Sequence, residues 1–150
     1  MNSTGRKLRV LFLCTGNSCR SQIAEGWARV LKGAEIEAFS AGTVAKGLDP
    51  RAVKVMAEAG VDISGQRSKT LADLRAAGQA EFDMVVTVCG AAHESCPIFP
   101  GKTRVIHAGF DDPPRLAENA RSEVEALGHY RRVRNEIREL VERLPEELLG

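Results

Sequence analysis

The chain has 150 residues, of which 43% are hydrophobic and 27% are charged, and its formal net charge at pH 7 is +1. This length fits one domain spanning 1–150, and the composition is typical of a soluble globular protein. No apolar run approaches the roughly 18 residues that a membrane-spanning helix needs. Because the net charge is close to zero, no bulk attraction predicts nucleic acid or a membrane as partner, and any anion site must be local.

The compartment is predicted from the N-terminal segment. An apolar run at 10–14 follows Arg6 and Lys7, as in a signal peptide, but it is shorter than the roughly 7–15 residues of a secretory segment. We therefore expect a cytoplasmic protein. In a reducing compartment, the four cysteines of the chain favour catalysis, redox chemistry or metal binding over a structural disulfide framework. Nothing in the pattern requires a large exposed apolar face, so we also expect a monomer.

Predicted strands and helices alternate along the chain. Large and β-branched apolar residues predict strands over 8–13, 36–41, 82–89 and 103–107. Apolar residues at helical spacing predict helices over 21–32, 50–59, 70–77 and 124–144. This alternation predicts a single α/β domain with a four-stranded, open, parallel sheet that has helices on both faces.

Reactive side chains gather where the predicted strands end. Cys14 ends the first strand, Cys89 ends the third with Cys96 in the loop beyond it, and Asp111 and Asp112 follow the fourth. Ligands of open α/β sheets bind at the carboxyl ends of the strands. We therefore expect the functional site at this edge.

The loop after the first strand has the pattern of an oxyanion site. It consists of Cys14, Thr15, Gly16, Asn17, Ser18, Cys19 and Arg20. Its length lets successive backbone N–H groups point at one tetrahedral anion, to which the helix N-terminus adds its dipole. The Arg20 guanidinium can hold two oxygens of that anion. The same field favours thiolate, so we predict a lowered pKa for Cys14 and a nucleophile there, with Ser21 placed to donate to its sulfur.

Six stretches of the sequence carry a family resemblance. They are Cys-Thr-Gly-Asn-Ser-Cys-Arg-Ser-Gln-x-Ala-Glu-Gly-Trp at 14–27, Ser-Ala-Gly at 40–42, Val-Val-Thr-x-Cys at 85–89, Cys-Pro-Ile at 96–98, Gly-Phe-Asp-Asp-Pro at 109–113 and Arg-Val-Arg-x-Glu-Ile at 132–137. Across nearly its whole length the chain resembles the low-molecular-weight protein tyrosine phosphatase fold family, and more closely its thioredoxin-coupled arsenate reductases. The resemblance implies that fold, and an enzyme without a bound cofactor that takes its electrons from thioredoxin.

The second cysteine pair separates a reductase from a phosphatase. Phosphate and arsenate are similar tetrahedral anions, but reducing arsenate also needs electrons from thiols, and Cys89 and Cys96 can form a disulfide if their loop bends. The resemblance implies that Cys14 attacks arsenate and that Cys89 attacks the adduct and releases arsenite. Cys96 then forms a disulfide with Cys89, which thioredoxin reduces. Phosphate or sulfate would compete with arsenate for the loop.

Other interpretations of the cysteines stay open from the residues alone. Cys89 and Cys96 could both be inert buried thiols. Zinc binding fits poorly because zinc knuckles space their cysteines two to four residues apart, so no metal site is predicted. The alternative function is a low-molecular-weight phosphatase that uses Cys14, Arg20 and Asp112. Against it, Pro113 is followed by Pro114 and not by the tyrosine pair of those phosphatases. A redox sensor without turnover, or a mycothiol- or glutaredoxin-linked reductase, would share part of the same machinery.

By the same resemblance, Asp112 before Pro113 is the general acid that protonates the leaving oxygen. Its neighbour Asp111 is the alternative, although an aspartate before a turn commonly caps its own backbone.

A potassium ion supports the loop in some arsenate reductases of this kind. Its ligands there match Asn17, Glu25 and Ser40, but Arg67 and Lys69 stand at the two remaining positions. A lysine ammonium could replace the cation as a point charge. We therefore predict no strong potassium dependence and expect Asn17, Glu25 and Ser40, together with Ser21, to support the loop.

Overall fold

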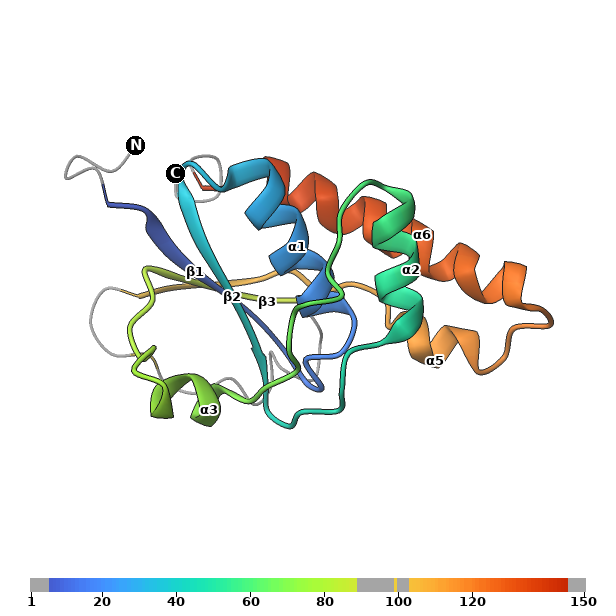
Figure 1. The fold of residues 1–150 in the computed structure, drawn as a ribbon, viewed down its shortest axis with the longest axis horizontal. Coiled ribbons are helices and arrows are strands. Elements are labelled where there is room, and N and C mark those ends of the chain that lie inside the picture. Colours follow the sequence, from blue (N-terminus) through green and yellow to red (C-terminus); the bar gives the residue numbers. More distant parts are fainter. Residues whose placement is uncertain (1–5, 89–98, 100–102, 146–150) are drawn as a thin grey trace.

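A computed structural model of the chain describes residues 6–88, 99 and 103–145. The strands within these ranges are β1 (Leu8–Cys14), β2 (Ile36–Gly42), β3 (Met84–Thr87) and β4 (Arg104–His107). The helices are α1 (Arg20–Lys32), α2 (Pro50–Glu58), α3 (Leu71–Ala76), α5 (Pro113–Ala117) and α6 (Glu123–Glu142). Strands and helices alternate along the chain, as the sequence predicts (Figure 1).

The four strands form one parallel sheet in the order β2-β1-β3-β4. The predicted four-stranded parallel sheet is thus confirmed. β1 lies inside the sheet, and its residues from Val10 to Cys14 are buried, as its continuous apolar run predicts. In the register, Cys14 at the end of β1 lies opposite Gly42 at the end of β2, so the carboxyl ends of these strands meet at one edge.

Helices lie on both sides of the strands. In Figure 1, α1 and α6 run side by side on one side, and α3 lies on the other. The pair of α1 and α6 is fixed partly by a hydrogen bond, since the buried Trp27 indole donates to the backbone oxygen of Arg134 over 3.1 Å. α3 buries Leu71 and Leu74 in the same core.

Two helix starts follow their sequence signals. Asp49 caps α2 by accepting a hydrogen bond from the Arg51 N–H, with Pro50 in the first helical position. Thr70 and Asp73 form a capping box at the start of α3. Both caps lie in segments that approach the loop after β1, so they help to fix the surroundings of the site.

Two details differ from the sequence predictions. The third strand is shorter than predicted, since β3 covers Met84–Thr87 within the predicted 82–89, although Phe82 is still buried. Val124 has helical spacing with the apolar residues of the predicted helix 124–144, but it is 76% exposed in the first turn of α6, where burial begins at Ala126.

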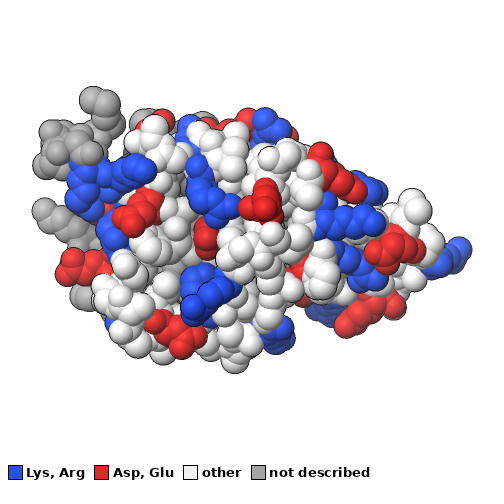
Figure 2. All heavy atoms as spheres, in the orientation of Figure 1, with Lys and Arg blue, Asp and Glu red and all other residues white. Residues whose placement is uncertain are grey.

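The surface shows no large area of one charge on the face drawn in Figure 2, where acidic and basic side chains are interspersed. None of the helices in the described part of the chain is long and apolar enough to cross a membrane.

Candidate active site

The loop between β1 and α1 lines a cavity of about 280 Å³ at the carboxyl edge of the sheet. The described residues around it are Cys14, Thr15, Gly16, Ser18, Cys19, Arg20, Lys46, Asp112 and Pro114. Three residues predicted to act together from distant parts of the sequence, Cys14, Arg20 and Asp112, therefore share one cavity. The predicted partners Cys89 and Cys96 lie outside the described residues.

Cys14 lies at the inner end of the loop and is 3% exposed. Its Sγ is 3.1 Å from the Ser21 hydroxyl oxygen, and Asn17 Nδ2 donates to the same oxygen over 2.9 Å. Because Asn17 occupies an acceptor position of the hydroxyl, the hydroxyl hydrogen is left to face the sulfur. This arrangement places Ser21 where it would stabilise a thiolate on Cys14.

Asn17 holds the curvature of the loop. Its φ is 46°, in the left-handed region that asparagine tolerates better than most side chains, and it is fully buried. Its Oδ1 accepts hydrogen bonds from the backbone N–H of Lys69 (2.8 Å) and from Gln22 Nε2 (2.9 Å). The side chain thus ties the loop to the 67–70 segment and to α1.

Gln22 is a supporting residue that the sequence reasoning missed. It is fully buried, and its Nε2 also donates to the backbone oxygens of Asn17 (3.1 Å) and Arg67 (2.9 Å). Its own Oε1 accepts from Gln66 Nε2 over 2.7 Å. A glutamine near a helix start is usually taken as solvent-facing. The available signal was its position inside the 14–27 motif, two residues after Arg20.

Gly42 lets the end of β2 approach the loop. A Cβ at this position would lie 2.6 Å from the backbone oxygens of both Thr15 and Val44 and 2.8 Å from the Asn17 nitrogen. The backbone N–H groups of Thr43 and Val44 both donate to the Thr15 oxygen over 3.0 Å. Only glycine fits between these backbone atoms, which gives a physical reason for the Ser-Ala-Gly stretch at 40–42.

The two aspartates after β4 face different partners. Asp112 Oδ1 lies 3.5 Å from Arg20 Nη2 and lines the cavity, while Arg20 Nη1 donates to the Phe110 oxygen over 3.0 Å. Asp111 instead pairs with Arg132 of α6 over 3.0 Å. The geometry therefore favours Asp112 over Asp111 as the carboxyl group that meets a bound anion.

The Cys19 thiol differs from that of Cys14. Burial, with a contribution from Asp49, raises the pKa of Cys19 well above its usual range. The thiol is therefore protonated at neutral pH. If Cys19 contacts a bound anion, it does so through its backbone N–H, as is expected of the other loop residues.

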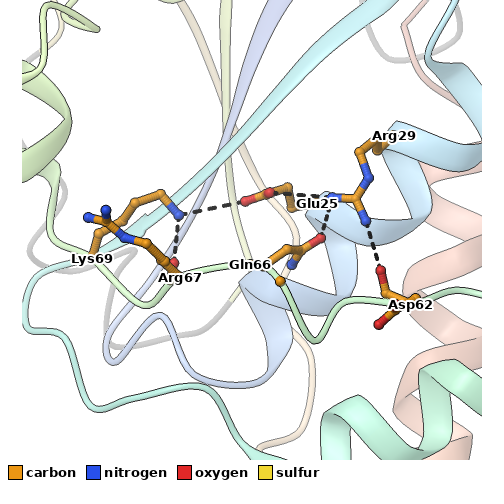
Figure 3. A pocket seen from close by; sticks show the side chains of 7 residues that line it. Glu25, Arg29, Asp62, Gln66, Arg67 and Lys69 are labelled. Carbon is orange, nitrogen blue, oxygen red and sulfur yellow. Dashed lines mark hydrogen bonds and ion pairs between the residues drawn. The ribbon is translucent and has the colours of Figure 1, made fainter.

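A second group of charged side chains lies around Glu25 of α1. It lines a cavity of about 480 Å³, in which Lys69 and Arg29 approach Glu25 from opposite sides (Figure 3). Lys69 Nζ lies 3.7 Å from Glu25 Oε1 and 3.4 Å from the Ser40 hydroxyl, which itself donates to Glu25 over 2.6 Å. Burial lowers the pKa of Lys69, and Glu25 opposes that shift. The ammonium thus contacts Glu25 and Ser40, two of the three residues matched to potassium ligands.

Activity and stability are therefore expected to be nearly the same in potassium as in sodium. Lys69→Gln should lower the free energy of unfolding by roughly 1–3 kcal/mol, because Glu25 and Ser40 lose a partly buried cationic partner. Urea denaturation measures stability and steady-state kinetics measure activity in each salt, with the exposed Lys54→Gln as control. A strong rise in wild-type stability and kcat/KM with potassium, absent with sodium, would show that Lys69 does not replace the ion.

Metal binding has no candidate among the residues that the structure describes, since no group of three or more His, Cys, Asp or Glu side chains there is placed to hold an ion.

The fold and the loop together define an α/β protein with a Cys-x5-Arg loop at the carboxyl edge of a parallel sheet. Residues 9–149 match the model of the low molecular weight phosphotyrosine protein phosphatase family. The chain therefore belongs to this family, and the resemblance that the motifs carry is confirmed at this level.

Known relatives include several arsenate reductases. The chain is 48% identical to an arsenate reductase of Bacillus licheniformis over 140 residues, which cover 93% of this chain and 96% of the relative. A solved structure of an arsenate reductase in the phosphate binding state has a TM-score of 0.70 and 32% identity, covering 93% of this chain and 96% of that one. The thioredoxin-dependent arsenate reductase of Corynebacterium glutamicum has a TM-score of 0.61 and 29% identity, covering 89% of this chain and 60% of that one.

Proposed function

We propose that this protein reduces arsenate to arsenite, with Cys14 as the nucleophile. The observation that carries the proposal is the cavity of about 280 Å³ that Cys14, Arg20 and Asp112 share. None of the described residues lining it is aromatic, so it offers no stacking surface for a phosphotyrosine ring and suits a small inorganic anion. The 48% identity to an arsenate reductase supports the same choice.

The first step joins sulfur to arsenic. The backbone N–H groups of residues 15–20 and the Arg20 guanidinium hold three arsenate oxygens, while the Cys14 thiolate attacks arsenic. Asp112 donates its proton to the oxygen that leaves, so water departs and a Cys14–arsenate adduct forms. Phosphate and sulfate have the same shape and compete for the loop. A phosphate binding state is named for one related arsenate reductase structure.

The next steps supply the electrons. Cys89 attacks the Cys14 sulfur, the sulfur–arsenic bond breaks, and its electron pair reduces As(V) to As(III), which leaves as arsenite. Cys96 then attacks Cys89, which frees Cys14 and leaves a Cys89–Cys96 disulfide. Thioredoxin reduces that disulfide and returns the enzyme to its starting state. The thioredoxin-dependent relative supports this choice of reductant, and no prosthetic group is needed because the thiols carry both electrons.

Asp112→Asn is expected to lower kcat/KM for arsenate by about 10²–10³-fold, since the amide cannot protonate the leaving oxygen. Asp111→Asn is the matched control and should change the rate little, because Asp111 pairs with Arg132 outside the cavity. Steady-state rates of both variants measure the difference. A larger loss in Asp111→Asn would reverse the assignment of the acid.

A phosphatase is the second candidate, because the family model itself is that of a phosphotyrosine phosphatase. The deciding experiment compares two substrates for the wild-type protein: arsenate, supplied with thioredoxin, thioredoxin reductase and NADPH, and an aryl phosphate. We expect steady arsenite production and only slow hydrolysis of the aryl phosphate. Efficient hydrolysis with no arsenite would replace the reductase proposal with the phosphatase.

A further inference from the structure

Lys46 is a second cation at the cavity. Among the described residues that line it, Arg20 and Lys46 are the positively charged side chains and Asp112 is the negatively charged one. The Asp112 carboxyl lies 3.5 Å from the Arg20 guanidinium, so Arg20 has a carboxyl partner in the cavity. Within the described part of the chain, no carboxylate lies within ion-pair distance of Lys46. Of the two cations among the described lining residues, Lys46 is therefore the one without a carboxylate within ion-pair distance.

The backbone of Lys46 is fixed to the loop. Its N–H donates to the Gly16 oxygen over 2.9 Å, and the preceding residues Thr43 and Val44 bond to the Thr15 oxygen. The aliphatic part of the side chain lies against Gly16: a Cβ there would be 2.9 Å from Lys46 Cδ and 3.2 Å from Cγ. The missing side chain of Gly16 thus leaves room for the lysine to lie over the loop.

We propose that Lys46 is a specificity-determining residue that attracts doubly charged tetrahedral anions to the Cys14 cavity. Its charge acts at the open side of the loop, where it favours an anion over a neutral molecule of similar size. It takes no part in the thiol chemistry, which belongs to Cys14 and its partners. That arsenate is the natural anion rests on the proposed function, whereas the preference for anions does not.

The test uses two reagents that differ in charge. Iodoacetate is an anion and iodoacetamide is neutral, and both alkylate the same thiolate, so the ratio of their rates at Cys14 cancels any change in thiolate fraction. Rates are measured at Cys14 by mass spectrometry of the wild type and of Lys46→Gln. We expect the iodoacetate-to-iodoacetamide ratio to fall about three- to tenfold in Lys46→Gln, and the fall to shrink at high salt. Lys46→Arg keeps the charge and should keep the ratio.

Lys7→Gln is the matched control, because it removes the same charge from the opposite end of β1. An unchanged ratio in Lys46→Gln, or an equal fall in Lys7→Gln, would overturn the proposal. With arsenate as substrate, Lys46→Gln should lower kcat/KM by a similar factor with kcat nearly constant. A lowered alkylation ratio with unchanged kcat/KM would refute arsenate as the anion that Lys46 attracts. If the wild type produced no arsenite, the proposed function alone would fail and the ratio would still decide the role of Lys46.

Discussion

Cys14→Ser is expected to abolish both arsenite production and aryl phosphate hydrolysis, with each rate falling by at least about 10⁴-fold. A serine hydroxyl is not ionised near neutral pH and is a much weaker nucleophile than a thiolate. The hydrogen bonds among Asn17, Ser21 and Cys14 would stabilise a thiolate, but they do not ionise a hydroxyl.

The fold of the Cys14→Ser variant should be intact, because the replacement is close in size and Ser21 still offers a hydrogen-bond partner. Thermal unfolding and phosphate binding by calorimetry check this. A folded variant that still turned over either substrate would contradict the assignment of Cys14 as nucleophile for that reaction.

Cys96→Ser is the second large prediction, and its effect should fall on one reaction only. Without the Cys96 thiol, the disulfide between Cys14 and Cys89 cannot be resolved, so arsenite turnover is expected to fall by at least about 10³-fold after the first cycle. Hydrolysis of an aryl phosphate needs only Cys14, Arg20 and Asp112 and should be nearly unchanged. Rates for both substrates measure the difference, and non-reducing peptide mapping should find Cys14 linked to Cys89.

Two results would contradict that prediction. Equal loss of both activities in Cys96→Ser would mean that the substitution disturbs the loop itself. Unchanged arsenite turnover would remove Cys96 from the relay and require another resolving thiol.

Much of the fold is predictable from local pattern. β1 is a continuous apolar run because it is covered on both faces, and α2 begins where Asp49 and Pro50 supply a cap and a preset first turn. Prediction from local pattern fails where the packing of neighbouring elements decides whether a side chain is buried. Val124 has the spacing of a core residue but is 76% exposed in the first turn of α6. Local spacing cannot show which side chains of a helix its neighbours cover.

The sequence likewise indicates some residues of the candidate site and not others. Cys14, Arg20 and Asp112 were selected from spacing and resemblance, and they meet in one cavity because parallel strands bring their carboxyl ends together. The sequence patterns do not indicate Gln22 or Lys46 as residues of the site. Gln22 acts through hydrogen bonds to Asn17 and to the distant 66–67 segment, and Lys46 reaches the cavity because Gly16 and Gly42 let two backbones approach. The bonds from Gln22 to Gln66 and Arg67 span 44 and 45 residues, so they leave no local periodicity, and the contact of Lys46 with Gly16 is equally remote from any helical or strand spacing.

In the proposed reaction, the three cysteine thiols of one chain supply the two electrons that reduce arsenate. The most direct measurement is a single turnover: the fully reduced wild-type protein receives one equivalent of arsenate without thioredoxin, arsenite is quantified, and the disulfides are mapped. We expect about one arsenite per chain and a disulfide between Cys89 and Cys96, with the Cys14 thiol regenerated. Unreduced arsenate, or arsenite formed with Cys89 and Cys96 still as thiols, would contradict it.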